Sequence, residues 1–398
     1  MERVINSRSV RAIALVTLTA VLWAVLPLGQ VLVSGQTEQT QTINFGKLKR
    51  SNKVSSRLYS ALESKSATSA KESGGAAVAR AAGKQYLVAS IEFTTPAARQ
   101  ALFSDAKVSR LAGATVLTVI DRFADVFLDS NAPLTQLTRN ASVVRVEGVQ
   151  RVSAPPPPAG TQSALPSRGV PDEIVRGGFG NLKGKGVIIA IVDTGVDFRH
   201  PDFITYDAAG RPTSRILNMW DTSLAYQPGR GSAAPVSFPN RASIGTLFSQ
   251  QQLTNELRST AKNIPPTDLG GHGTACASVA AGNGNADFRG TGGLKRKEVI
   301  GVAPEADIIA VRMGEEGFEN GYLLNAIAEW LDKAAGAKPL VVSGSFGGHW
   351  YGHDGQTIEE RQLNARFPLT KVGRAIVFAA GNEGNDPFHA EVRHHADP

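Results

Sequence analysis

The distribution of apolar and polar residues predicts a small α+β module in the first half of the chain. Residues 86–93 are predicted to form a strand, 95–106 a helix that begins at Thr95 and Pro96, and 114–130 a pair of strands. Residues 132–154 supply a second helix and a final strand. The order strand, helix, two strands, helix, strand is typical of a split βαβ layout.

A different pattern follows the prolines at 155–158, which cannot enter the interior of a sheet or a helix. Four apolar runs, at 187–193, 306–313, 339–347 and 375–382, have the composition of buried strands and alternate with helical stretches. Such strands predict a parallel sheet covered on both faces. The fold class is therefore α/β, a doubly wound parallel sheet preceded by the small α+β module.

The N-terminus has the features of an export signal. Arg3, Arg8 and Arg11 precede an uncharged apolar stretch from Ala12 to Leu28, and residues 33–35 offer small or modest side chains at a cleavage point before Gln36. The alternative is an uncleaved membrane anchor, and only in that case would the protein contact a membrane. Either interpretation predicts that the chain leaves the cytoplasm and is secreted or extracellular.

These patterns divide the chain into five parts. We predict a signal peptide or anchor over 1–35, a flexible leader over 36–84, a ferredoxin-like module over 85–154, a proline-rich linker over 155–165 and the α/β domain over 166–398. The leader prediction rests on a composition rich in Ser, Ala, Lys and Gln. A further segment, 206–240, is rich in Gly, Pro and Ser and is interpreted as a long surface loop, with Trp220 and Tyr226 interspersed.

Composition and charge narrow the possible functions. Apolar residues make up 42% of the 398 residues and charged residues 19%, which is typical of a globular protein. The net charge of +7 comes from scattered basic residues, so no nucleic-acid partner is predicted. The single cysteine, Cys276, excludes an internal disulfide, and its place among small helical residues favours an inert, packed thiol.

Three polar residues stand where predicted strands end or a helix begins. Asp193 follows a buried strand, His272 opens a small-residue helix, and Asn382 follows the last strand. In parallel sheets such positions meet at one edge. A carboxylate and an imidazole there can form an acid–base pair, and an amide can donate to an oxyanion, so the three residues could assist a hydroxyl nucleophile.

The triplet Asp193-Thr194-Gly195 also matches the catalytic triplet of aspartic proteases. Those enzymes need two such carboxylates, and the triplet occurs once in this chain. That interpretation would also leave His272 and Asn382 without a role.

Together and in this order, the motifs resemble the subtilisin family of serine endopeptidases. The resemblance covers roughly residues 166 to 390 and includes the segment 301–313. It implies that Asp193 is the triad aspartate, His272 the general base and Asn382 the oxyanion-hole donor. Ser345, Phe346 and Gly347 match the Ser-Leu-Gly strand that binds the substrate backbone in that family.

The same resemblance has implications for partners and ions. It implies polypeptide substrates, and it implies that the 85–154 module is the protein's own propeptide, a folding assistant and inhibitor removed on maturation. No cofactor is required for the chemistry. A structural calcium ion near Asp202, in the sequence His-Pro-Asp-Phe, is also implied.

One departure from the family stands out. Its nucleophile lies in a Gly-Thr-Ser-Met-Ala segment, which these 398 residues do not contain. We therefore expect a fragment of a longer, secreted proenzyme that hydrolyses peptide bonds through an Asp-His-Ser triad, the fragment itself being inactive. The alternative is a noncatalytic pseudoprotease that binds peptides.

Overall fold

The computed structural model describes residues 51–55, 58, 78–81, 84–149, 152–153, 182–286, 296, 299–314, 318, 321–348 and 354–382. The chain divides into two units, 1–40 and 41–398, and every described residue belongs to the second. The predicted signal or anchor and the predicted proline-rich linker lie outside the described residues. Among the helices of the described part, none has both the length and the apolar character needed to cross a membrane.

The first half of the described chain forms an antiparallel sheet with two helices. Its elements are, in chain order, β1 (Val78–Ala81), β2 (Lys84–Phe93), α4 (Pro96–Leu102), β3 (Ala114–Ile120), β4 (Phe123–Leu128), α5 (Asn131–Arg139) and β5 (Val143–Gly148). From β2 onward the order is the predicted one, with β5 and β4 on opposite sides of β2 and β3 beyond β4. This element order is that of a split βαβ layout.

Part of the predicted leader packs against this sheet. Val54 forms a bridge with Val146 and is 6% exposed, and Leu58 is fully buried in the same apolar cluster. β1 pairs with the start of β2. These contacts differ from the prediction of a flexible segment because single apolar residues in a polar stretch give no periodic signal, although the sheet offers each of them a buried position.

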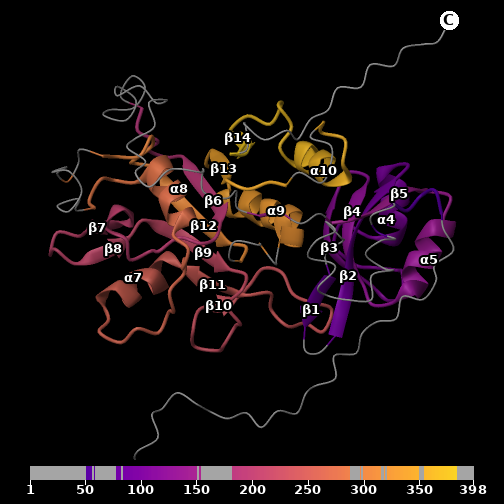
Figure 1. The fold of residues 1–398 in the computed structure, drawn as a ribbon, viewed down its shortest axis with the longest axis horizontal. Coiled ribbons are helices and arrows are strands. Elements are labelled where there is room, and N and C mark those ends of the chain that lie inside the picture. Colours follow the sequence, from indigo (N-terminus) through magenta and orange to yellow (C-terminus); the bar gives the residue numbers. More distant parts are fainter. Residues whose placement is uncertain are drawn as a thin grey trace, which may run out of the picture. The chain divides into compact units, whose positions relative to one another are not determined.

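The second half is built on a seven-stranded sheet, seen in Figure 1. Its strands are β6 (Ile188–Asp193), β9 (Ile216–Asp221), β10 (Ser232–Ala233), β11 (Thr246–Ser249), β12 (Asp307–Arg312), β13 (Leu340–Gly344) and β14 (Arg374–Phe378). They lie in the order β10-β11-β9-β12-β6-β13-β14. The five from β9 to β14 in this order are parallel, and β10 and β11 are antiparallel additions.

The remaining elements are helices and a small hairpin. They are η1 (Pro201–Phe203), β7 (Ile204–Tyr206), β8 (Pro212–Ser214), α7 (Gln250–Arg258), α8 (His272–Ala281), η2 (Gly321–Leu323), α9 (Leu324–Ala335) and α10 (Ile358–Arg366). The two faces of the sheet are buried by different helices. Val192 of β6 belongs to the same apolar cluster as Ile327 of α9, whereas Ile191 clusters with Ala277 of α8. The predicted doubly wound sheet is confirmed.

The interpretation of 206–240 as a surface loop was wrong for its central part. Ile216–Asp221 is the strand β9 of the main sheet, and Trp220 is fully buried. Its indole N–H donates to the Ile244 carbonyl oxygen at 2.9 Å, and its ring meets Trp330 edge-on. The sequence hid this strand because one short apolar run lies between long stretches of turn-forming residues.

The antiparallel sheet and the helices α9 and α10 share buried polar contacts. Glu92 of β2 forms a two-pronged ion pair with Arg361, with both N···O distances 2.8 Å. Asp125 of β4 accepts hydrogen bonds from Ser90 at 2.6 Å and from Gln362 at 2.8 Å. Burying such groups is costly unless each is paired, so these contacts fix one arrangement of the sheet on the helices.

Asp125 gives this contact a pH dependence. Burial raises the pKa of its carboxyl from 3.8 to about 6, although the hydrogen bonds and the Arg366 charge act in the opposite direction. The stabilising contribution of the protonated form is present below about pH 4 and is lost as the pH rises through about 6.

We therefore predict that Asp125→Asn is more stable than the wild type at about pH 8, and that this advantage falls by about 2 to 3 kcal/mol at about pH 4. The carboxamide keeps an acceptor oxygen but carries no charge to bury. Urea unfolding at the two pH values measures the difference. Asp121→Asn, at an exposed carboxylate of the same sheet, serves as the control. Equal effects of Asp125→Asn at both pH values would contradict the prediction.

Candidate active site

Three neighbouring parallel strands end at one edge of the sheet, close to residues singled out from the sequence. β6 ends at Asp193, β13 is followed directly by Ser345, and Asn382 comes four residues after the end of β14. β13 lies between the other two strands, with Gly344 in register with a residue of each. Because parallel strands present their carboxyl ends at the same edge, the topology brings these segments together.

Asp193 and His272 are 79 positions apart in the sequence and form a hydrogen bond. His272 Nδ1 lies 2.7 Å from Asp193 Oδ1. His272 is the first residue of α8, which contacts β6. The Asp193 side chain is 1% exposed and the His272 side chain 33% exposed. The buried carboxylate can therefore orient an imidazole that a substrate can reach.

The buried Asp193 carboxylate favours a positively charged imidazole at His272. Burial raises the pKa of Asp193 above its usual value, against the effect of hydrogen bonds from His272 and Thr194. The Thr194 backbone N–H donates to the same oxygen, Oδ1, at 2.7 Å. Because the buried carboxylate lacks bulk water, it gains most when the imidazole takes up a proton.

Two glycines allow α8 to approach the end of β6 this closely. A Cβ added to Gly273 would stand 3.0 Å from Asp193 Cβ and would overlap the carbonyl oxygen of Gly195. Gly195 has a φ of +120°, and a Cβ there would overlap the Thr267 carbonyl oxygen. A side chain at position 273 would therefore push the start of α8 away from Asp193, and one at position 195 would displace the segment around Thr267 that leads to α8.

Cys276 lies one helical turn after His272, with its Sγ 3.9 Å from His272 Nδ1. Burial, reinforced by the charges of Asp193 and Asp268, raises the pKa of its thiol to about 11. The thiol is thus protonated near neutral pH and is not a ready nucleophile. Asp193, His272 and Cys276 are the group in the described residues whose ligand atoms lie close enough for a metal ion, within 4.8 Å. His272 Nδ1 and Asp193 Oδ1 are already bonded to each other, and the Cys276 thiol keeps its proton near neutral pH.

The segment Ser345, Phe346 and Gly347 extends β13 and pairs with another part of the chain. The Gly347 N–H donates to the Ser153 carbonyl oxygen at 3.1 Å, and the Ser153 N–H donates to the Gly347 oxygen at 3.0 Å. This antiparallel bridge is the pattern by which an extended peptide adds to a sheet. The backbone N–H and carbonyl oxygen of Gly347 are therefore able to bind an extended peptide backbone.

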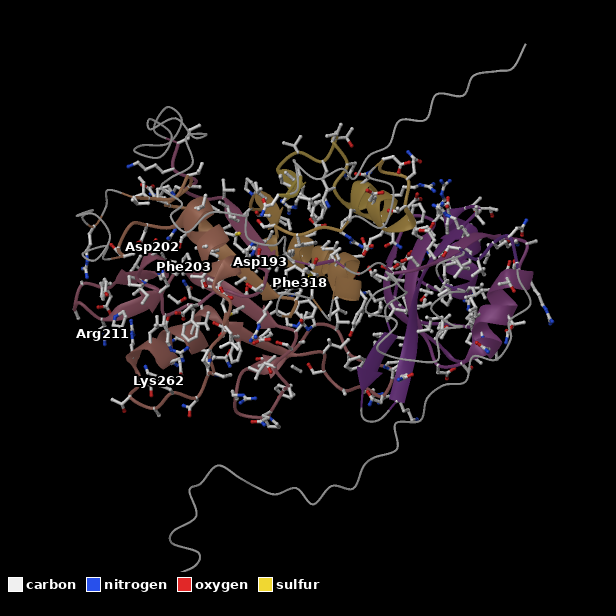
Figure 2. All side chains as sticks on the ribbon, viewed as in Figure 1. Asp193, Asp202, Phe203, Arg211, Lys262 and Phe318 are labelled. Carbon is white, nitrogen blue, oxygen red and sulfur yellow. The ribbon has the colours of Figure 1, made fainter. Side chains whose placement is uncertain are left out.

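The side chain next to this bridge is buried. Val152, directly before Ser153, is 8% exposed and belongs to the same apolar cluster as Phe318 and Phe346. The rings of Phe318 and Phe346 meet edge-on, with centroids 5.4 Å apart. A Cβ at Gly321 would stand 3.0 Å from Val152 Cγ2, so Val152 packs directly against the backbone at Gly321. Phe318 and Asp193 are labelled in Figure 2.

Asn382 is exposed and follows Gly381, whose φ of +98° turns the chain after β14. The structure places Asn382 at the same sheet edge as Asp193 and Ser345. Its role as an oxyanion donor stays a prediction.

Asp202, the expected calcium ligand, lies in η1. Its Oδ1 accepts from the Ala286 backbone N–H at 2.9 Å, and its carbonyl oxygen accepts from Arg215 Nη1 at 2.8 Å. The same guanidinium donates to three more carbonyl oxygens, those of Ala281, Pro304 and Ala306.

The surroundings of Asp202 therefore already hold a cation. Burial lowers the pKa of Arg215, and the charges of Asp202 and Asp307 oppose that effect. Calcium needs six to eight oxygen ligands, whereas here four carbonyl oxygens are directed to a guanidinium. The described residues around Asp202 do not fit a calcium ion, and we derive no role for one.

Comparisons with known proteins agree with this geometry. Residues 184–396 match the Subtilase family, a range that includes Asp193, His272, Ser345 and Asn382. The chain belongs to the subtilase family. The predicted resemblance is thereby confirmed for the family and for its α/β fold.

Several proteins are similar to this subtilase chain. Subtilisin-like protease SBT2.2 of Arabidopsis thaliana is 28% identical over 216 residues, which cover 54% of this chain and 24% of that protein. Thermitase of Thermoactinomyces vulgaris is 29% identical over 203 residues, 51% of this chain and 50% of thermitase. The solved CspB protease of Clostridium perfringens matches with 27% identity and a TM-score of 0.36, over 52% of this chain and 37% of that one. The chain thus spans a quarter to a half of these proteins' lengths.

Two residues that hold the segments around the pair were given no role there by the sequence analysis. Asp268 and Thr194 bond to each other and to the first turn of α8. The available signal was weak, a carboxylate shortly before a helix, because such residues are common helix caps.

The surroundings of Asp202 generate a prediction. Arg215→Met should lower the free energy of unfolding by about 3 to 5 kcal/mol, since it removes the buried guanidinium that donates to four carbonyl oxygens. Calcium and a chelator should shift the unfolding temperatures of the wild type and of Asp202→Asn equally. Arg211→Met, at a residue whose side chain is 65% exposed, is the matched control and should cost less than about 1 kcal/mol. Calcium stabilisation that Asp202→Asn abolishes would contradict this assignment.

Proposed function

We propose that this chain is part of a secreted serine-type endopeptidase in which Asp193 and His272 activate a serine hydroxyl. The observation that supports the proposal is the 2.7 Å hydrogen bond between a buried carboxylate and a half-exposed imidazole, at the sheet edge beside a strand able to bind peptide backbone. The match to the Subtilase family agrees with this chemistry.

In the proposed mechanism, His272 takes the proton of the serine hydroxyl while the serine oxygen bonds to the scissile carbonyl carbon. Asp193 holds the ring so that Nδ1 faces the carboxylate and Nε2 is free to accept the proton, and it stabilises the imidazolium that forms. Asn382 donates to the negative oxygen of the tetrahedral intermediate. His272 then gives its proton to the leaving amine, and water hydrolyses the acyl-enzyme. The serine belongs to the complete protein.

The proposed substrates are polypeptides bound in extended form along Ser345, Phe346 and Gly347. The two backbone hydrogen bonds between Gly347 and Ser153 support this, because they do not depend on the side chain at position 153. Backbone pairing would supply general affinity, and the apolar surroundings of Val152 would favour an apolar side chain at that position of the bound chain. The chemistry requires no cofactor.

The 85–154 module is proposed to be the protein's own propeptide. The support is that Ser153 already pairs with Gly347, and that Glu92 and Asp125 of the preceding sheet bond to α10. A chain held in this way would block the strand against other peptides. Export through the N-terminal segment is proposed from the arginines before the apolar stretch at 12–28.

A noncatalytic, peptide-binding protein is the alternative left open by the sequence. The pairing of Ser153 with Gly347 would serve it equally well. The two functions differ in whether His272 is needed for turnover.

In the complete protein, we predict that His272→Ala lowers kcat for a peptide substrate by at least about 10³-fold while leaving the unfolding midpoint nearly unchanged. The reason is that no other described side chain is placed to take the proton beside Asp193. His200→Ala, at the imidazole that caps η1, is the control and should keep its activity. Peptide binding without hydrolysis in the wild type, or a kcat that His272→Ala leaves intact, would overturn the proposed function.

A further inference from the structure

Asp268, four residues before His272, links the end of β6 to the start of α8. Its Oδ1 accepts hydrogen bonds from Thr194 Oγ1 at 2.9 Å and from the Gly271 backbone N–H at 3.0 Å. Its Oδ2 accepts from the backbone N–H of Thr274 at 2.8 Å and from the Thr274 hydroxyl at 2.6 Å. One carboxylate therefore receives four hydrogen bonds from both sides of the Asp193–His272 contact.

The partners of Asp268 are themselves tied to the acid–base pair. Thr194 follows Asp193, and its backbone N–H donates to Asp193 Oδ1. The Thr194 hydroxyl accepts from the backbone N–H of Gly273, the residue directly after His272, at 2.9 Å. The path from Asp193 through Thr194 to the first turn of α8 thus closes into a ring with the 2.7 Å bond between His272 and Asp193.

The start of α8 depends on Asp268 for its hydrogen bonds. Gly271 is the N-cap and has no side chain to accept from the first turn. Asp268 takes over that function from outside the helix, and its negative charge lies at the positive end of the helix dipole. The Thr274 hydroxyl, held by Asp268, also accepts from the Asp197 backbone N–H at 2.9 Å. Rotation or translation of α8 would break several of these bonds at once.

We propose that Asp268 is a positioning residue that holds His272 at bonding distance from Asp193 by fixing α8 against the end of β6. The proposal deepens the proposed function and rests on it for its catalytic meaning. The effect of Asp268 on the distance between His272 and Asp193 can be tested without measuring activity. An aspartate suits the place because both oxygens of a carboxylate accept, whereas an asparagine side chain turns an NH₂ group toward one pair of donors.

The first test is proton NMR of the 398-residue chain. The Nδ1 proton shared by His272 and Asp193 should give a resonance far downfield of the amides, assigned by its loss in Asp193→Asn. Asp268→Asn should shift this resonance or abolish it at temperatures well below the unfolding transition. Asp197→Asn is the matched control, because that carboxylate bonds to the Arg199 N–H instead of bridging to Thr194.

A purely structural role gives a different result, namely a lower unfolding midpoint with the resonance unchanged, and that result would overturn the proposal. If Asp268→Asn does not fold, Thr194→Val takes its place, since it removes the bridging hydroxyl but leaves the Asp268 contacts to α8. An unchanged resonance in Thr194→Val would then count against the proposal.

The second test uses the complete protein. Asp268→Asn should lower kcat about 10- to 100-fold with little change in KM, because the bound substrate would meet a displaced base. A change in KM alone would overturn the proposal. If the complete protein shows no peptidase activity but the resonance behaves as expected, the proposed function fails while the positioning role of Asp268 stands.

Discussion

The hydrogen bond between Asp193 and His272 joins the last residue of one sheet strand to the first residue of a helix 79 positions later. It forms only if the backbone of α8 packs close to the backbone that follows β6. Glycines at 195 and 273 make that approach possible. Apolar residues of β6 and α8, Ile191 and Ala277 among them, pack in one cluster. The site is therefore a consequence of how tightly one helix packs on the sheet.

Two charged side chains, one at each end of α8, each hold several backbone groups. Asp268 caps a helix whose own N-cap is a glycine, and Arg215 supplies a positive charge beside Asp202. Both groups are held by several backbone atoms, so each fixes the path of more than one segment. Buried polar networks of this kind stabilise one arrangement of the chain and restrict the movement of α8, which carries His272.

The fold and the acid–base pair could be predicted from the sequence because their signals are local. Apolar runs mark β6, β12, β13 and β14, and the rule that parallel strands end at one edge brings Asp193 toward its partner. β9 was missed because its apolar run is short and surrounded by turn residues. Asp268 was missed because its importance arises from hydrogen bonds to residues far along the chain, which residue type and spacing do not encode. The fit of calcium at Asp202 could not be judged before Arg215 was located.

The proposed catalysis depends on the buried Asp193 carboxylate, which orients His272 for proton transfer. The most direct test compares kcat of the complete protein with that of Asp193→Asn, which keeps the shape of the side chain but turns the carboxylate into an amide. A fall of about 10⁴-fold is expected, because the amide no longer holds the imidazole in the tautomer that accepts the serine proton. A kcat within about tenfold of the wild type would contradict the claim.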